Sequence, residues 1–485
     1  MCGIYLLYSK QGKSLAELHE NLRLIQHRGQ DSYGIYYKNG GNVILNNNKG
    51  KIEKYLGNER TNLFMGHLRY KTSGAIGEDG TQPVFTTNKF GEFSFVYNGN
   101  IPCKEYTFLY NHEFSLDTTL IKHFFETEDK VCNNWTELLE KFINTFSRGY
   151  SIIITTKKEI YLLKDRYGVR PLCYAFSEEL QELEVTSESV GITLENEIVE
   201  LNSGSVYEFK IDNIAKPIEK FNYIKKNKMV KDYGGKCIFE YIYFLNPETN
   251  WNYVSTDKIR RDWAECLAKK DLKYNSFQDP KRYLVIGIPS TGIQPGQAYA
   301  DYLNIDYSQS ITKNPHISRT FILSKTDRDA ASKKKYIYDS AKIQGKKIII
   351  IDDSIVRGIT MKNIVYRLFE CGALEVHIRI ISPEIRDICK YGIDIPTHDE
   401  LIATGRDIEA MNEYFKSTSL RFLCPTDMRK TINGYIKETN FCSGCFDSNY
   451  GETIGYKDFI DSETSKVNST INICQKQNKN TDLSW

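Results

Sequence analysis

The second residue of the chain is a cysteine, and its position gives it a chemistry that internal cysteines lack. A small residue after Met1 favours removal of that methionine, which leaves Cys2 with both a thiol and a free α-amine. The amine has a reference pKa of about 8, so one residue carries a nucleophile and a base together. The alternative is an ordinary cysteine on an apolar core strand over residues 2–8. Position alone leaves both interpretations open.

Three polar segments favour the catalytic interpretation of this cysteine. Residues 27–31 (His-Arg-Gly-Gln-Asp) and 66–72 (Gly-His-Leu-Arg-Tyr-Lys-Thr) combine cationic groups with turn residues. Residues 97–100 (Tyr-Asn-Gly-Asn) predict a turn that points backbone N–H groups outward. The alternative for this last segment is a plain β-hairpin turn, which Asn-Gly also indicates.

A second candidate site follows the β-branched run at residues 347–351. Asp352 and Asp353 come directly after this run, and a loop containing Gly358 leads to a helix near Thr360. Paired carboxylates at a strand end suit ribose hydroxyls and Mg²⁺. A glycine-containing loop that leads into a helix N-terminus suits a phosphate. The alternative is an acidic turn that closes a strand, but the combination favours a ligand site.

The two candidate sites fall in halves with different patterns. In the front half, Ser14 and Glu17 form a capping-box pattern for a helix that ends near residue 25. Short strand-like runs follow, which together with few helices predict an α+β layered domain. These runs cover residues 33–37, 63–69, 93–97, 150–155, 159–164 and 204–209.

The back half predicts a βαβ unit and therefore a parallel sheet. Its strands are expected at 283–288, 347–351 and 375–381, and its helix has Ile364, Val365, Leu368 and Phe369 on one apolar face. The polar segment 222–236 marks the boundary. We therefore expect domains at 2–225 and 226–450, followed by a flexible polar tail at 451–485.

Composition excludes several classes of protein. The 485 residues include 64 basic and 62 acidic ones, a net charge of +2, which argues against a nucleic-acid binder. The 40% apolar content argues against a disordered chain. The sequence contains no run of about 18 apolar residues, so it does not predict a membrane span. The N-terminus lacks the features of a signal peptide. We expect a cytoplasmic protein with no nucleic-acid or membrane partner.

Twelve cysteines in such a chain need an explanation other than disulfides. Most fit as small buried apolar residues. Cys442 and Cys445 form a C-x-x-C pair, which indicates either a metal site or a redox site. The spacing alone does not decide between these two.

The motifs of the front half resemble the glutaminase domain of the N-terminal-nucleophile amidotransferases, an αββα layered fold. The resemblance rests on residues 1–4, 27–29, 66–70 and 98–100, which occur in the order of that family. It implies that a cysteine attacks the side-chain amide of glutamine, releasing ammonia and leaving a glutamyl thioester. By motif match, Cys2 is the nucleophile, Asn98 and Gly99 form the oxyanion hole, Arg28 supports Cys2, and Arg69, Thr72 and Asp117 bind glutamine.

Residues 350–360 resemble the phosphoribosyl pyrophosphate (PRPP) motif of type I phosphoribosyltransferases. Their form is that of the amidophosphoribosyltransferase family, glutamine-dependent enzymes that open purine synthesis, and the resemblance extends over about residues 2–450. It implies an α/β domain with a parallel sheet behind the glutaminase domain, and Mg²⁺ on Ser290, Asp352 and Asp353. The PRPP contacts that it implies are Ser290, Lys313, Arg319, Asp352, Asp353, Ser354, Arg357, Gly358 and Thr360.

The resemblance also explains the cysteines. The iron–sulfur subgroup of this family has four cluster ligands, which match Cys237, Cys389, Cys442 and Cys445 and imply a [4Fe–4S] cluster. Members of the subgroup often carry a propeptide; here we expect removal of Met1 alone to expose the nucleophile. The family further implies a homo-oligomer, a tetramer or dimer, and feedback inhibition by purine nucleotides.

Three loops depart from the family pattern. The loop at 289–292 (Pro-Ser-Thr-Gly) lacks an acid, and Ile359 replaces a threonine in the phosphate loop. The loop at 313–321 contains Pro315 and His316, and proline fixes φ and restricts the preceding residue. One alternative is therefore a weakened paralogue that binds PRPP or a nucleotide and regulates. Another is a different glutamine-dependent transferase, against which the acid pair and the four cysteines argue.

Overall fold

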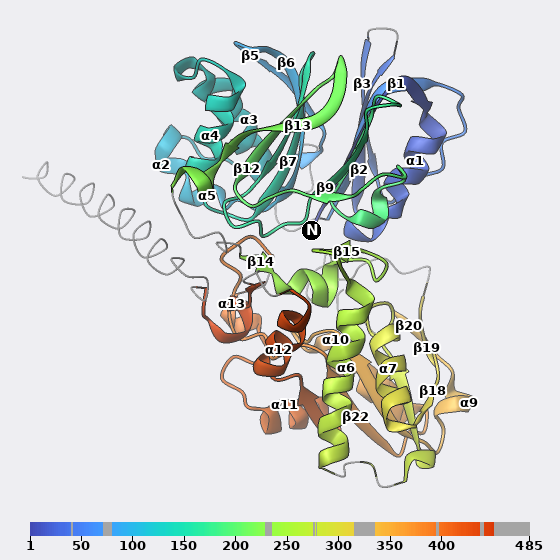
Figure 1. The fold of residues 1–485 in the computed structure, drawn as a ribbon. Coiled ribbons are helices and arrows are strands. Elements are labelled where there is room, and N and C mark those ends of the chain that lie inside the picture. Colours follow the sequence, from blue (N-terminus) through green and yellow to red (C-terminus); the bar gives the residue numbers. More distant parts are fainter. Residues whose placement is uncertain are drawn as a thin grey trace, which may run out of the picture.

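The chain folds into two halves stacked end to end, as a computed structural model shows (Figure 1). The structure describes residues 1–39, 42–70, 80–227, 235–274, 277, 279–314, 335–393, 397–436 and 441–450. The predicted tail lies outside these ranges, as do Thr72, Arg319 and the altered positions Pro315 and His316.

The front half contains two stacked antiparallel sheets. The first sheet has the order β11 (Val199–Glu200), β9 (Cys173–Ser177), β10 (Glu182–Thr186), β1 (Gly3–Ser14), β4 (Arg60–Arg69), β2 (Ser32–Asn39) and β3 (Asn42–Lys49). The second has the order β13 (Asn213–Asn222), β12 (Ser205–Lys210), β8 (Glu159–Lys164), β7 (Tyr150–Thr155), β6 (Gly91–Gly99) and β5 (Val84–Asn88). The predicted strand-like runs of this half are confirmed.

Helices cover the outer faces of both sheets. Helix α1 (Leu15–Leu24) lies on the first sheet, and α3 (Asp117–Thr127) and α4 (Trp135–Thr145) lie on the second. The predicted cap of α1 is present, because the Ser14 hydroxyl accepts the Glu17 N–H. Alternating apolar side chains of the strands fill three cores, one between the sheets and one under each helical layer. The αββα prediction is therefore confirmed.

The back half is built on a five-stranded parallel sheet. Its order is β18 (Asp306–Tyr307), β17 (Tyr283–Gly287), β21 (Lys347–Asp352), β22 (Glu375–Ile380) and β23 (Ser419–Phe422). Helices α6 (Thr256–Lys273), α7 (Ile293–Leu303) and α12 (Pro425–Tyr435) cover one face. Helices α10 (Ile359–Glu370) and α11 (Ile408–Phe415) cover the other. This confirms the predicted βαβ unit.

One residue of the predicted apolar face of α10 does not join the core. Ile364, Val365 and Leu368 are buried, but Phe369 is 38% exposed. At 100° per residue, Phe369 lies roughly 90° from the centre of the buried stripe, so it reaches only the edge of the apolar core.

Short elements occupy the level where the halves meet. They include α5 (Tyr223–Lys226), β14 (Lys236–Cys237), the π-helix η6 (Glu240–Phe244), β15 (Asn250–Trp251), β16 (Val254–Ser255), β24 (Phe441–Cys442) and α13 (Gly444–Asp447). The remaining short elements are η1 (Gln26–Arg28), η3 (Cys103–Glu105), α2 (Thr107–Tyr110), η4 (Glu128–Val131), η5 (Ser189–Gly191), η7 (Pro280–Arg282), β19 (Ile311–Lys313), β20 (Tyr336–Tyr338), α9 (Ser340–Ile343) and η9 (His398–Glu400).

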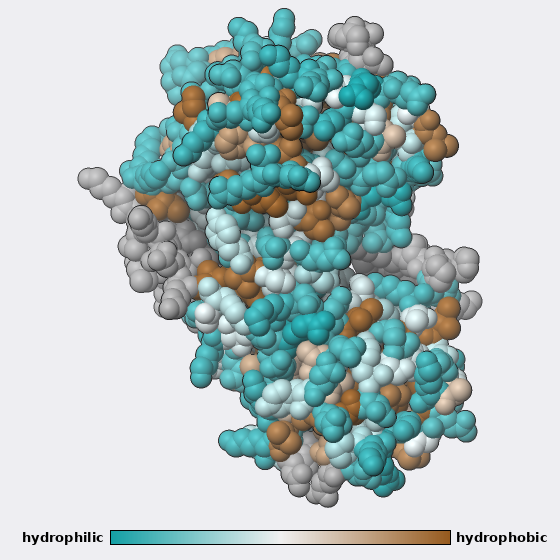
Figure 2. Space-filling model, turned by 45° about the vertical axis from the view of Figure 1, so that its right-hand side comes forward, coloured by the Kyte–Doolittle hydropathy of each residue, from teal (hydrophilic) through white to brown (hydrophobic). Residues whose placement is uncertain are grey.

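The face in Figure 2 is mainly hydrophilic, with scattered apolar patches on both halves. Across the described ranges, no helix combines the length and the apolarity that a bilayer crossing requires.

Candidate active sites

The structure holds Cys2 at both of its backbone groups. Its N–H donates to Asn98 Oδ1 at 3.1 Å, and its carbonyl accepts from Arg28 Nε at 3.0 Å. Cys2 immediately precedes β1, and Asn98 lies at the end of β6 in the other sheet. The nucleophile is therefore fixed between the ends of two stacked sheets, at the level where the halves meet (Figure 1).

Asn98 also presents a free donor. Its amide Nδ2 is buried and has no hydrogen-bond partner in the structure. Gly99 ends β6, and the chain continues into η3 rather than returning as a hairpin, so the plain-hairpin alternative is wrong. Because Oδ1 is occupied by Cys2, Nδ2 is the group of Asn98 left to stabilise a developing oxyanion.

A cavity of about 360 Å³ opens beside Cys2. Arg69, at the end of β4, and Asp117, at the start of α3, both line it. Burial raises the pKa of Asp117, whose carboxylate accepts from Tyr97 Oη at 3.1 Å and from the Ile101 N–H at 3.3 Å. A cation and a carboxylate in one cavity suit the carboxylate and the ammonium of a free amino acid.

His67 belongs to this cavity wall, although the sequence analysis assigned it no role. Its side chain is buried, and Nε2 has no hydrogen-bond partner. Burial, together with the nearby Arg69, lowers the pKa of His67 to about 3, so the ring is neutral. The feature of the sequence that could have identified His67 is its position inside the predicted 66–72 segment.

Arg28 lies in a buried ionic network that joins the halves. Its Nη1 pairs with Glu188, and its Nη2 lies 3.3 Å from Glu240 Oε2. Glu188 and Glu240 were not among the predicted site residues. The next residue, Gly29, must be glycine, because a Cβ there would lie 2.4 Å from the Leu68 carbonyl of β4.

The acid pair lies at the carboxyl end of β21, as predicted. Asp353 Oδ1 accepts from the Ser354 hydroxyl at 2.5 Å, and Oδ2 accepts from the Thr291 hydroxyl. Burial raises the pKa of both Asp352 and Asp353, and repulsion from Asp353 raises that of Asp352 further. A cation would relieve the repulsion between these two buried carboxylates. Mg²⁺ commonly binds one or two carboxylates together with substrate phosphates.

The phosphate loop connects this acid pair to α10. Gly358 has φ +79° and precedes the helix, a conformation that favours glycine, and Thr360 lies in the first turn. Arg357 pairs with Glu400 at 2.5 Å. Lys313, the last residue of β19, donates from Nζ to Oγ of Ser290, which lies on the loop after β17, at 3.2 Å. The described members of the predicted PRPP set thus lie on the loop after β17, at the end of β19, and on the segment from the end of β21 to the first turn of α10.

The four cysteines of the predicted cluster gather where the halves meet. Cys237 and Cys442 are direct neighbours in the parallel pair of β14 and β24. The Cys445 carbonyl accepts the N–H groups of Arg386 and Asp387, close to Cys389. Burial and the neighbouring thiols raise the pKa of Cys237, Cys442 and Cys445.

The sulfur of Cys389 accepts two backbone hydrogen bonds. The donors are the N–H groups of Tyr391, at 3.4 Å, and Ile393, at 3.3 Å. Within the described ranges, no three His, Cys, Asp or Glu side chains converge on one metal ion. The thiols therefore form a group without forming a site for a single ion.

A small cavity of about 30 Å³ adjoins Cys2 and has walls from both halves. Tyr70 and Gly99 contribute from the front half, and Phe244, Gly392 and Ile393 from the back half. Residues of both halves therefore border the nucleophile.

Comparisons with known proteins match both halves. A family model described as a glutamine amidotransferase domain matches residues 1–231, and one described as a phosphoribosyl transferase domain matches residues 253–382. An amidophosphoribosyltransferase from Methanocaldococcus jannaschii is 27% identical, covering 96% of this chain and 100% of its own length. One from Bacillus subtilis is 28% identical, covering 95% of each chain.

A solved structure agrees with these matches. Glutamine PRPP amidotransferase from B. subtilis, complexed with ADP and GMP, superimposes with a TM-score of 0.77 at 26% identity. The match covers 93% of this chain and 97% of the other. The similarity therefore includes the arrangement of both halves.

Proposed function

We propose that this chain, which belongs to the amidophosphoribosyltransferase family, makes 5-phosphoribosylamine from glutamine and PRPP, with release of glutamate and pyrophosphate. This reaction begins de novo purine synthesis. One observation carries the proposal: a cavity built around Cys2 and an acid pair at a parallel strand end lie in one chain, with a second cavity at the nucleophile whose walls come from both halves.

Glutamine hydrolysis follows from the geometry around Cys2. The thiol attacks the side-chain amide carbon, and the α-amine that removal of Met1 exposes takes the thiol proton and returns it to the leaving nitrogen. Asn98 Nδ2 and the Gly99 N–H stabilise the oxyanion. Ammonia leaves, and water hydrolyses the thioester to glutamate.

Arg69 and Asp117 select the free amino acid. The Arg69 guanidinium binds the α-carboxylate, and Asp117 binds the α-ammonium. Burial raises the pKa of Asp117, but the cationic ammonium stabilises its charged form. Thr72 is proposed as a further contact.

Ammonia must reach the second site without meeting bulk water, because free ammonia at neutral pH is mostly ammonium. The cavity lined by Tyr70, Phe244 and Ile393 supports an internal route. At its end, ammonia attacks C1 of PRPP and pyrophosphate leaves. The ribose and phosphates bind to Asp352, Asp353 and the loop from Ser354 to Thr360, with Lys313, Arg319 and Ser290 at the pyrophosphate.

The carboxylates fit Mg²⁺, which we assign to Asp352, Asp353 and Ser290. A bound Mg²⁺ would supply charge neutralisation for the pyrophosphate leaving group. The raised pKa of both acids supports this assignment, since a cation relieves the repulsion between them.

The four thiols of Cys237, Cys389, Cys442 and Cys445 support a [4Fe–4S] cluster, and we propose that the chain belongs to the iron–sulfur subgroup. A cluster distributes its thiolates over four iron atoms, so its ligands need not converge on one ion. The N–H donors at Cys389 suit a thiolate sulfur. The cluster would supply no redox step and would connect three separate segments. Iron and acid-labile sulfide analysis of anaerobically purified protein tests it, and absence of both contradicts it.

Regulation, assembly and location complete the proposal. The B. subtilis relative was solved with ADP and GMP, which supports feedback by purine nucleotides. We also propose a homo-oligomer. Every cysteine in the described ranges is free, which suits a reducing cytoplasm.

The decisive experiment measures pyrophosphate release from PRPP with glutamine, using anaerobically prepared, cluster-loaded protein. Release that depends on both substrates supports the proposed function. The missing acid in the 289–292 loop favours a second candidate, a regulatory paralogue. Binding of PRPP without any release would support that candidate and reject the enzyme.

A further inference from the structure

We propose that Glu240, a residue of the back half, is a positioning residue for glutamine hydrolysis at Cys2. It would act through Arg28, which connects the Glu240 carboxylate to the carbonyl of the nucleophile. The inference rests on the proposed function and extends it, because it makes the glutaminase site incomplete without one carboxylate of the transferase half.

A continuous set of contacts carries the inference. Arg28 Nε donates to the Cys2 carbonyl at 3.0 Å, and Arg28 Nη2 donates to Glu240 Oε2 at 3.3 Å. Arg170 Nη1 donates to the second carboxylate oxygen of Glu240 at 3.4 Å. The side chains of Arg28, Arg170 and Glu240 are all 0% exposed. Water therefore does not replace these bonds when one is lost.

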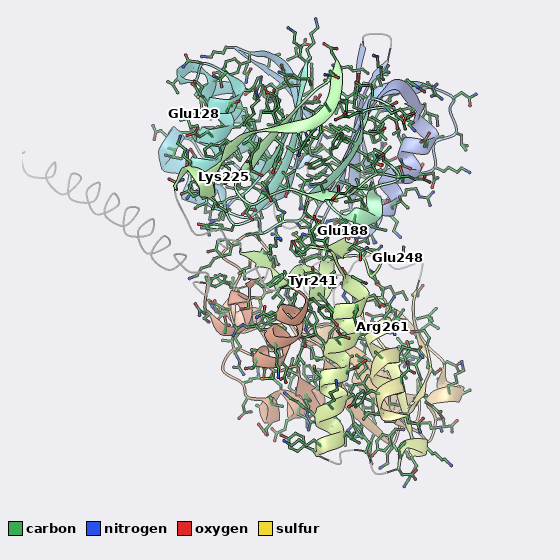
Figure 3. All side chains as sticks on the ribbon, viewed as in Figure 1. Glu128, Glu188, Lys225, Tyr241, Glu248 and Arg261 are labelled. Atoms are coloured by element: carbon green, nitrogen blue, oxygen red, sulfur yellow. The ribbon has the colours of Figure 1, made fainter. Side chains whose placement is uncertain are left out.

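The back half fixes Glu240 firmly. Glu240 begins the π-helix η6, in which the Leu245 N–H donates to the Glu240 carbonyl at 2.9 Å. From α6, Arg260 donates to the Tyr241 carbonyl at 2.7 Å and to the Leu245 carbonyl at 2.8 Å. Tyr241 lies where the halves meet (Figure 3). Single-turn π-helices are frequent at functional sites.

Glu188 is the second carboxylate that pairs with the Arg28 guanidinium. It pairs with Arg28 Nη1 and His27, and its Oε2 accepts the Asn246 N–H at 2.8 Å and the Thr249 hydroxyl at 2.6 Å. Figure 3 shows Glu188 close to the back half. Burial alone would raise the pKa of Glu188, but His27 and Arg28 hold it well below its usual range. Arg28 is thus held between one carboxylate from each half.

The consequence for Cys2 follows from charge balance. Two buried arginines, Arg28 and Arg170, meet two buried carboxylates, Glu188 and Glu240. A neutral amide at position 240 leaves one buried positive charge uncompensated, and Arg170 already has Nε and Nη2 without partners. Arg28 would then shift toward Glu188, and the Cys2 carbonyl would lose the donor that orients the residue.

The test compares E240Q with E248Q. Glu248 is exposed in the same junction (Figure 3), and its side chain makes no contact with Arg28, so E248Q is the matched control. Three rates are measured: glutamate release from glutamine, alkylation of Cys2 by a chloroketone analogue of glutamine, and pyrophosphate release from PRPP with ammonium salt. The third rate needs only the back half.

We expect E240Q to lower kcat for glutamine hydrolysis and the alkylation rate of Cys2 by about 10- to 100-fold, the cost of misplacing a reacting group. The KM for glutamine and the ammonia-dependent rate should stay near their wild-type values, because Glu240 touches neither substrate. E248Q should match the wild type. E240D keeps the charge with a shorter reach and should recover part of the loss.

Unchanged hydrolysis and alkylation in E240Q would overturn the inference alone. Equal losses in all three rates would also overturn it, because they indicate a merely structural role. If E240Q does not fold, E240D carries the test: a selective loss of hydrolysis supports the inference, and wild-type hydrolysis overturns it. A wild type that fails to hydrolyse glutamine would instead overturn the proposed function, and this inference with it.

Discussion

The two halves of the molecule build their sites in opposite ways. Around Cys2, hydrogen bonds already fix the nucleophile and its neighbours: Asn98 and Arg28 bind the backbone of Cys2, and Tyr97 donates to Asp117. At the strand end of β21, Asp352 and Asp353 face each other, and burial with mutual repulsion raises the pKa of the pair. One site is assembled before substrate arrives, and the other has an excess of negative charge.

The difference follows from where each site lies. The glutaminase groups lie at the ends of strands in two sheets that a common core holds together, so their spacing is fixed by the fold. The residues of the second site lie at and after the ends of strands, where N–H groups and carboxylates can bind a ligand. We therefore expect binding energy at the first site to serve catalysis directly, and the proposed cation to relieve the repulsion at the second site.

The variant with the largest expected effect is Cys2→Ser, which tests whether the two sites act separately. We expect glutamine-dependent product formation to fall by at least ~10⁴-fold, because a hydroxyl beside an amine is a far weaker nucleophile than a thiol. Product formation from PRPP and ammonium salt should remain. The two rates are measured on the same preparation. Loss of both would show that the halves do not work as separate sites.

Asn98→Ala tests whether the glutaminase site is as complete as its contacts indicate. The variant removes the unpartnered Nδ2 donor and the acceptor of the Cys2 N–H. We expect kcat for glutamine hydrolysis to fall by about 10²- to 10³-fold, the usual cost of one oxyanion donor. The KM for glutamine should change little, since Arg69 and Asp117 remain. A rise in KM at constant kcat would place Asn98 in substrate binding instead.

Asp352→Asn tests the charge excess of the second site. Loss of this proposed Mg²⁺ ligand should lower PRPP turnover by about 10²-fold. Without metal, the variant should melt at a higher temperature than the wild type, because a buried acid whose pKa is raised in the fold destabilises it at neutral pH.

Added Mg²⁺ provides the control for this variant. It should raise the melting temperature of the wild type and leave that of D352N nearly unchanged. An equal response of both proteins to Mg²⁺ would argue against a metal on Asp352. Glutamine hydrolysis in D352N should match the wild type, which separates the two sites again.

Much of both sites could be predicted from the sequence, because many of their residues lie in short segments at the ends of apolar runs. Cys2 and Asn98 lie at strand ends that apolar runs mark, and the acid pair follows such a run directly. Glu188 and Glu240 were missed because they pair with Arg28 across 160 and 212 residues, and no local pattern marks a buried carboxylate. Phe369 was misplaced because apolar spacing alone does not locate the edge of a buried stripe.

The smallest effect concerns one buried histidine in each half. Burial lowers the pKa of His67 to about 3 and that of His377 to about 4, in each case with a nearby arginine adding to the effect. The unfolded chain takes up protons below a pKa of about 6.5 while the folded chain does not, so stability falls as pH drops from about 6.5 toward these values. Each of these two histidines should lower the free energy of unfolding by about 2 kcal/mol at pH 5.

Urea unfolding at pH 7 and pH 5, followed by separate probes for the two halves, measures this loss. His67→Gln should reduce the pH dependence of the front half, where the ring has an unpartnered Nε2. His377→Gln should reduce that of the back half, where Nδ1 and Nε2 contact Ser419 and Glu375. If either variant changed both halves equally, the halves would unfold as one cooperative unit, and their difference would be confined to the chemistry of the sites.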